Sequence, residues 1–132
     1  MQDLLVFQLI SWIALPTVMF GGYSFLVLLP GKLTPHQQTF FRAGHAHAGV
    51  LLILSLAYYY SLSLTSLALN TQYLACTLLL GGIILQSGGF FWHTFLDGGG
   101  ARKTGVGLTC VGALLLVIAI VILVYGLIVA HA

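Results

Sequence analysis

Two histidines set two residues apart, with an arginine just before them, are the residues of this chain best suited to chemistry. They lie in residues 41–50, FRAGHAHAGV, within a long apolar segment. Ionisable side chains inside such a segment are costly and usually functional. Imidazole nitrogens bind transition metals and haem iron, so the stretch predicts a metal or haem site.

The spacing of the two histidines bears on how a ligand would be held. Residues i and i+2 lie roughly 200° apart around an α-helix, so His45 and His47 point to opposite sides. One helix cannot easily bring both imidazoles to one metal, whereas His45 of one copy and His47 of a neighbour could face each other. We therefore predict that His45 and His47 are metal ligands and that the ligand lies between subunits of a homo-oligomer.

The composition indicates that membrane spans carry these residues. Charged residues make up 5% of the 132 residues and hydrophobic residues 60%, whereas about a quarter of a soluble domain is charged. Four runs are long and apolar enough to cross a bilayer, at about residues 4–29, 35–63, 72–96 and 104–129. We predict an all-α, four-helix transmembrane bundle in a single domain, residues 1–132. Nucleic-acid binding is excluded because no basic face exists to neutralise phosphates.

Local signals refine these spans. Pro16 falls inside the first span and removes a backbone hydrogen bond there. Thr34 followed by Pro35 is typical of a helix N-cap and the first helical position. The glycine pairs at 81–82 and 88–89 predict close helix packing in the third span.

The basic residues and most of the histidines belong to one end of the predicted bundle. With four spans, the first loop and the third loop share a face, and the third loop is expected at the glycine-rich residues 97–103. That face also receives Asp97. Every lysine and arginine and most histidines are expected at this same face, namely Lys32, Arg42, Arg102, Lys103, His36, His45, His47 and His93.

This inventory favours haem over a bare metal ion. A zinc site normally gathers four protein ligands, and the only carboxylates are Asp3 and Asp97. A haem needs one or two axial imidazoles, an apolar slot and cations for its propionates. Gly44 and Gly49 would leave room for a flat macrocycle beside the helix. The predicted cofactor-binding residues are Arg42, His93, Arg102 and Lys103.

Two segments resemble subunit I of the haem–copper oxidases. Residues 43–51, AGHAHAGVL, are similar to its haem-ligating helices. One of those helices carries A-H-A, and another carries A-H-x-H with histidines that serve two haems on opposite sides. Residues 90–98, FFWHTFLDG, with Arg102 and Lys103, are similar to its F-F-x-Q-H-F-L-G-L…R-R segment, whose arginines bind haem propionates. Both matches have the order and spacing of one four-helix repeat of that twelve-helix subunit.

The resemblance implies a single-repeat relative in which three copies, a homotrimer, stand in for the whole subunit. It implies non-covalent haem b, with His45 and His47 as axial ligands and Arg102 and Lys103 as propionate partners. His93 aligns with a histidine of the family pattern. The family's copper-binding histidines have no counterpart in this sequence, so we expect electron transfer or redox or gas sensing and not oxygen reduction.

Other functions and the orientation stay open at this point. The alternatives are a histidine-lined transporter of metal ions or small solutes, and an accessory subunit of a respiratory complex. The expected partners are the lipid bilayer, further copies of the chain, and a quinone or a cytochrome as redox partner. We expect a prokaryotic plasma membrane. The positive-inside rule puts the basic loops in the cytoplasm, the resemblance puts them outside, and we favour cytoplasmic termini.

Overall fold

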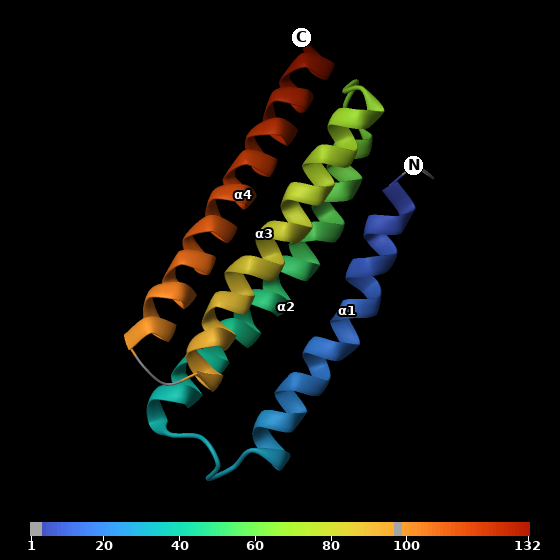
Figure 1. Ribbon diagram of the computed structural model, residues 1–132. Helices are drawn as coiled ribbons and strands as arrows, with labels where there is room; N and C mark the ends of the chain where they lie inside the picture. The colour runs from blue at the N-terminus through green and yellow to red at the C-terminus, as the bar shows by residue number, and fades with distance from the viewer. Residues whose placement is uncertain (1–3, 97–98) are drawn as a thin grey trace.

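The described residues, 4–96 and 99–132, form an antiparallel bundle of long helices in the computed structural model (Figure 1). The helices are α1 (Leu5–Tyr23), which continues into the π-helix η2 (Ser24–Leu28), then α2 (Pro35–Ser63), α3 (Leu69–Phe95) and α4 (Gly99–His131). Within this described part of the chain, four helical segments are long and apolar enough to cross a membrane. The prediction of an all-α chain with four potential spans is confirmed.

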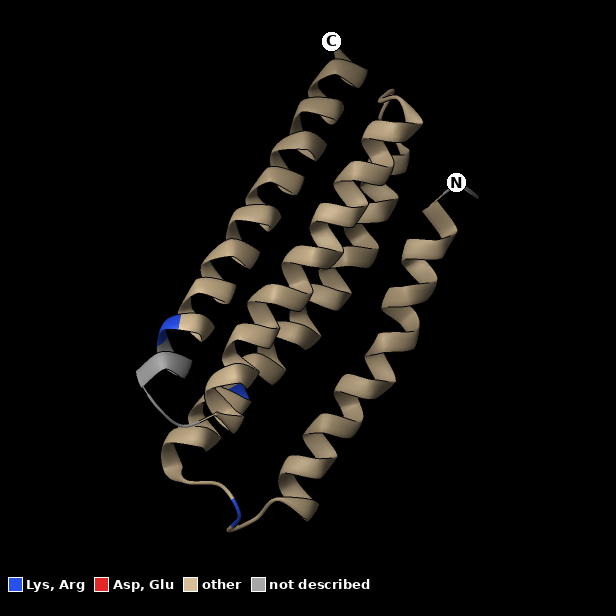
Figure 2. Cartoon of the chain, in the orientation of Figure 1, with Lys and Arg blue, Asp and Glu red and all other residues tan. Residues whose placement is uncertain are grey.

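The two ends of the bundle differ in charge. The α2–α3 link, the start of α1 and the end of α4 lie at one end (Figure 1). The α1–α2 link and the start of α4 lie at the other end (Figure 1), and Figure 2 shows there the described basic residues Lys32, Arg42 and Lys103. We call this second end the basic end. The orientation of the two ends relative to the cytoplasm stays a prediction.

The helix boundaries match the sequence signals except at the start of α4. Thr34 caps α2, since its hydroxyl accepts from Gln37 N at 3.3 Å while the Gln37 side chain accepts from Thr34 N at 2.9 Å. Residues 99–103 were expected to belong to the third loop, but α4 begins at Gly99. Glycine lowers helix propensity without forbidding a helix, and Ala101, Arg102 and Lys103 are good helix formers. Asp97 lies outside the described residues.

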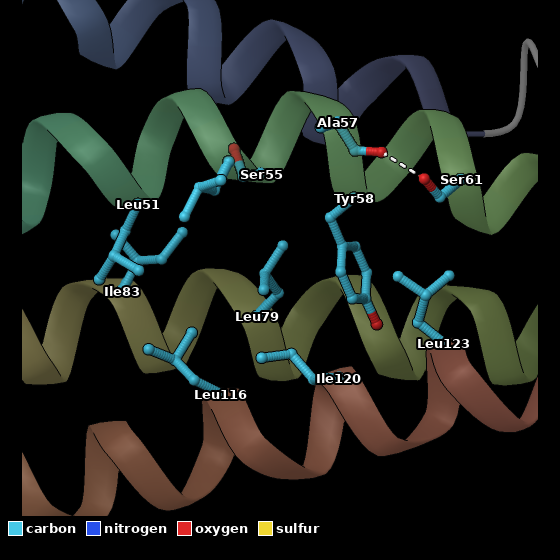
Figure 3. Close-up of a pocket in the computed structure, with 11 residues that line it drawn as sticks. Leu51, Ser55, Ala57, Tyr58, Ser61, Leu79, Ile83, Leu116, Ile120 and Leu123 are labelled. Atoms are coloured by element: carbon cyan, nitrogen blue, oxygen red, sulfur yellow. Dashed lines mark hydrogen bonds between the residues drawn. The ribbon is translucent and has the colours of Figure 1, made fainter.

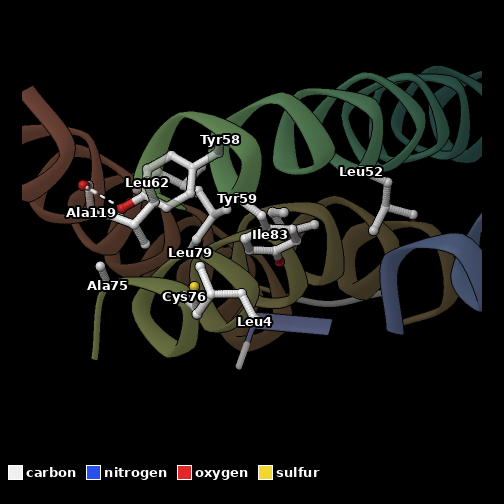
Figure 4. Packing of buried hydrophobic residues seen from close by; sticks show 11 residues of the cluster. Leu4, Leu52, Tyr58, Tyr59, Leu62, Ala75, Cys76, Leu79, Ile83 and Ala119 are labelled. Atoms are coloured by element: carbon white, nitrogen blue, oxygen red, sulfur yellow. Dashed lines mark hydrogen bonds between the residues drawn. The ribbon is translucent and has the colours of Figure 1, made fainter. Parts of the chain in front are cut away.

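Most of the hydrophobic core lies in the half of the bundle remote from the basic end. Figure 4 shows how its side chains pack. The Tyr58 hydroxyl donates to the Ala119 carbonyl oxygen at 2.7 Å and so ties α2 to α4. Tyr59 is fully buried beside it. The other buried hydrophobic members come mostly from α2 and α3, including Leu52, Leu62, Ala75, Cys76, Leu79 and Ile83.

Glycines bring the backbones of α3 and α4 into direct contact. The contact surface, which we call the α3–α4 seam, comprises Gly82 and Gly89 on α3 and Gly105 and Gly112 on α4. A Cβ added at Gly82 would lie 3.0 Å from Gly112 O, and one at Gly89 would lie 2.6 Å from Gly105 O. Small residues permit such close approach between membrane helices. One glycine of each predicted pair therefore packs closely, whereas a Cβ at Gly88 would meet nothing within 4 Å.

Candidate functional site

His45 lies between α2 and α1, at a glycine pair of α1. A Cβ added at Gly22 would lie 3.0 Å from His45 Nε2, and one at Gly21 would lie 3.4 Å from His45 Nδ1. The imidazole also stacks on Phe41, with ring centroids 6.3 Å apart and planes 12° from parallel. The missing side chains of the glycine pair therefore leave the space that the half-buried imidazole uses.

An open groove of about 630 Å³ begins at His45 and runs between α1 and α2. Its volume is in the range typical of small-molecule and cofactor sites. Along α2, Gly49 and Ile53 follow His45 at intervals of four residues, which places them on one helix face. The groove is lined by Trp12, Leu15, Pro16, Val18, Met19, His45, Gly49, Ile53 and Leu56. Apart from the imidazole and the Trp12 indole, the side chains facing it are hydrocarbon or thioether.

Arg42 holds a positive charge on the His45 side of α2, one turn nearer the basic end. Its guanidinium carbon lies 5.1 Å from the centre of the Phe25 ring, a distance that permits a cation–π contact. Phe25 in turn stacks on Phe41 with a centroid distance of 5.1 Å. A second hollow of about 310 Å³ lies beside Arg42 and is lined also by Phe25, Gln38 and residues of the α1–α2 link. The cation therefore lies between the α1–α2 groove and the basic end.

His47 faces a different part of the bundle, as its spacing from His45 predicts. Its Nδ1 lies 2.8 Å from the Ala43 carbonyl oxygen. Because a carbonyl can only accept, Nδ1 carries the proton in this hydrogen bond, and in the neutral tautomer Nε2 is the nitrogen with the lone pair, the arrangement found in metal-binding histidines. The ring packs on Phe90 of α3 at 4.7 Å between centroids. A shallow groove of about 210 Å³ lies beside His47, lined also by Ala46, Val50 and Leu51.

The structure does not bring His93 or the start of α4 to the α1–α2 groove. His93 is buried against Phe40, 4.6 Å between ring centroids, and beside Gly105 of α4. Lys103 is exposed near the start of α4, and Gly105 in the same part of α4 packs against Gly89 and His93 of α3. The side chain of Arg102 lies outside the described part of the structure. A role for these residues in cofactor binding stays a prediction.

The two glycines expected to make room beside α2 behave differently. A Cβ at Gly49 would make ordinary contact with Val18 Cγ1 at 3.6 Å, so Gly49 does border the open groove. A Cβ at Gly44 would lie 3.0 Å from Phe90 Cβ, so α3 already fills the space beside Gly44. The expectation of space beside Gly44 is corrected, because α3 fills that face of α2.

A further groove of about 320 Å³ lies among α2, α3 and α4 (Figure 3). Its hydroxyls already have partners. Ser61 donates to the Ala57 carbonyl oxygen at 2.9 Å, Tyr58 bonds to α4, and Ser55 bonds to the Leu52 carbonyl and to the Ser11 hydroxyl. This groove therefore presents a hydrocarbon surface.

The wall that α1 contributes to the groove was missed by sequence reasoning. Trp12, Pro16 and Met19 recur at intervals of four and three residues, which is helical spacing. Apolar residues at helical spacing do not indicate a groove wall within a span where nearly every residue is apolar. Only the position of α1 against α2 reveals that these residues line the same groove as His45.

Comparison with known proteins finds no family model, curated protein or solved structure that matches this chain. Within residues 4–96 and 99–132, no three histidine, cysteine or carboxylate side chains form a group that could hold a metal ion. A single imidazole in an apolar groove is a donor set that suits haem, because the porphyrin supplies four nitrogens itself.

Proposed function

We propose that the chain is a haem b-binding membrane protein that transfers electrons, and that the haem binds in the α1–α2 groove. The observation that carries this proposal is the combination of one imidazole, His45, with an apolar groove of about 630 Å³ and a cation, Arg42, one turn toward the basic end. An amphipathic cofactor with an apolar ring and anionic propionates matches this arrangement.

Each part of the groove would have a distinct role. His45 would donate a nitrogen lone pair to the iron, and Arg42 would attract the propionates toward the water. The apolar side chains of α1 and α2 would cover the ring and keep water away. When bound, haem supplies a one-electron couple, whose potential the protein tunes through ligands, charge and burial.

The proposal also includes the homotrimer, with His47 of one copy serving a haem at a neighbouring copy. The shallow groove beside His47 and its oriented Nε2 support a role as ligand, since a partner could approach from that side. The transporter alternative gains less support, because His45 and His47 lie on different sides of α2 and do not line one path.

Optical spectroscopy of protein expressed with ample haem tests the proposal. We expect a Soret band in the parent and its loss in His45→Ala, because the groove would lose its iron ligand. His131→Ala, at an exposed histidine of the other end, is the matched control and should keep the band. Native mass spectrometry of the same samples should show trimers that carry haem.

Two results would contradict this assignment. A parent protein with no Soret band after haem supplementation would exclude haem binding. A band that survives His45→Ala but disappears in His47→Ala would move the haem from the α1–α2 groove to the other side of α2.

A further inference from the structure

Arg42 is an exposed cation in a helix long enough to span a membrane, and the described residues offer it no carboxylate partner. Residues 4–96 and 99–132 contain no aspartate or glutamate, since Asp3 and Asp97 fall outside them. The guanidinium carbon instead lies 5.1 Å from the centre of the Phe25 ring. A ring face attracts a cation without neutralising its charge, so the charge of Arg42 can still attract an anion from outside the chain.

The hollow of about 310 Å³ beside Arg42 has room for such an anion. It is lined by the π-helix η2, the α1–α2 link and the α2 residues Gln38 and Arg42. A π-helix is rare and is frequently found at functional sites. Arg42 is the charged residue of this lining, and Lys32 follows directly after Gly31, which lines the hollow from the link. The site therefore combines space with positive charge.

The position of Arg42 along α2 matches the level of lipid headgroups. The 29 residues of α2 span roughly 44 Å at 1.5 Å per residue, whereas the hydrocarbon core of a bilayer is roughly 30 Å thick. The polar first turns, with His36, Gln37, Gln38 and Thr39, place part of the surplus length at the basic end. Arg42 lies roughly 10 Å from the first residue of α2, and its long side chain can carry the charge outward to the interface.

The surface next to the hollow suits hydrocarbon chains. Leu26 lines the hollow and is 73% exposed, and the neighbouring Val27 and Leu28 are exposed as well. A ligand that enters the hollow from the bilayer would therefore meet a cation at one end and apolar side chains beside it. A phospholipid has this arrangement of phosphate and acyl chains, whereas a free phosphate ion would use only the cation.

We propose that the hollow beside Arg42 binds the headgroup of an anionic phospholipid from the surrounding leaflet. The Arg42 guanidinium would bind two phosphate oxygens through its planar fork of donors, and Lys32 would add a second positive charge. Basic pockets of membrane proteins bind lipid headgroups in this way. Two cations at one phosphate favour a lipid with net negative charge over a zwitterionic lipid, whose own cation they repel.

This site is separate from the proposed haem site. Arg42 lines the hollow, whereas the α1–α2 groove begins one turn further along α2, at His45. A guanidinium carries five N–H donors, and a carboxylate bound through both oxygens takes two of them. Donors therefore remain for a phosphate when a haem propionate is bound, and the lipid site does not depend on haem.

Native mass spectrometry of delipidated protein tests the proposal. The probe is a detergent solution with equal amounts of phosphatidylglycerol and phosphatidylcholine. The parent should retain phosphatidylglycerol in several-fold excess, and Arg42→Gln should lose that excess. Arg42→Lys should retain an intermediate amount, because it keeps the charge without the planar fork. Phe25→Leu should also be intermediate, because it removes the ring that positions the guanidinium.

Lys103→Gln is the matched control, an exposed cation of the same end on α4, and it should keep the parent's preference. An Arg42→Gln variant with parental helical circular dichroism and parental phosphatidylglycerol retention would overturn the proposal, and so would an equal loss in Lys103→Gln. Displacement of the lipid by inorganic phosphate would show a site for free anions instead. The Soret band of the same samples reports the haem site independently, so either site can fail while the other holds.

Discussion

The α3–α4 seam and the α1–α2 groove are both antiparallel helix pairs made of apolar residues and glycines, yet they pack in opposite ways. In the seam, glycines place backbone against backbone, so that a Cβ at Gly82 or Gly89 would collide with the facing helix. In the groove, the glycine at 49 borders open space of about 630 Å³. Glycine content alone therefore does not distinguish a closed interface from an open one.

The difference assigns separate tasks to the two pairs. In a membrane, helix association depends on close van der Waals packing, because lipid is as apolar as the helix surface. The seam satisfies that requirement, and α3 and α4 are the closely packed pair of the bundle. The helices α1 and α2 pack less closely, and His45 lines the groove that remains between them. We expect substitutions in the seam to change stability and substitutions in the groove to change ligand binding.

The largest effect is expected at Gly112 of the seam. A Cβ there would collide with the backbone nitrogen of Gln86, which cannot move aside as a flexible side chain could. Gly112→Ala should lower the free energy of unfolding by at least about 2 kcal/mol. Gly107→Ala is the matched control on the same helix, since a Cβ at Gly107 would meet nothing within 4 Å, and it should change stability by less than about 1 kcal/mol.

Unfolding in detergent, followed by the helical circular-dichroism signal, measures both variants. Equal stability of Gly112→Ala and Gly107→Ala would contradict the close contact of the seam. It would also remove the distinction between the two helix pairs.

A smaller effect of a different kind is expected at Gly49 of the groove. Gly49→Leu should leave the free energy of unfolding within about 1 kcal/mol of the parent, because the new side chain enters open space. The same side chain occupies the proposed haem site, so haem content should fall several-fold. Haem-to-protein ratios from the Soret band, measured beside the unfolding curves, check both parts. A loss of stability as large as that of Gly112→Ala would show that the groove is closed.

The smallest effect is expected at the cation beside the groove. Arg42→Gln should lower the midpoint potential, because a nearby positive charge favours the reduced haem. A unit charge roughly 8 Å away contributes on the order of 2 kcal/mol at an effective dielectric constant of about 20. For a one-electron couple this is on the order of 90 mV, which solvent screening reduces, so we expect tens of millivolts.

Redox titration at low salt measures this shift. Arg102→Gln and Lys103→Gln, at the start of α4, provide the comparison. A larger fall in either of them than in Arg42→Gln would favour the propionate partners implied by the oxidase resemblance and count against Arg42.

The sequence predicts features that depend on local helix geometry. It does not predict which faces of neighbouring helices come into contact. The opposite directions of His45 and His47 follow from the helical repeat alone, and the cap at Thr34 follows from its hydroxyl and the proline after it. The facing partner of His45 could not be predicted, because it depends on the rotation of α1 against α2. Likewise, Gly88 and Gly89 are equivalent in sequence, and only the orientation of α3 puts Gly89 in the seam.

The hydrogen bond between Ser11 and Ser55, 2.8 Å long, links α1 to a position 44 residues later in the chain. Translation proceeds from the N-terminus at about 5–20 residues per second. Ser11 is therefore synthesised on the order of seconds before its partner Ser55. The α3–α4 seam forms later still, after α4 has been made. Both walls of the groove are thus synthesised before α4 exists, so the proposed haem site would be complete while the chain is still being made.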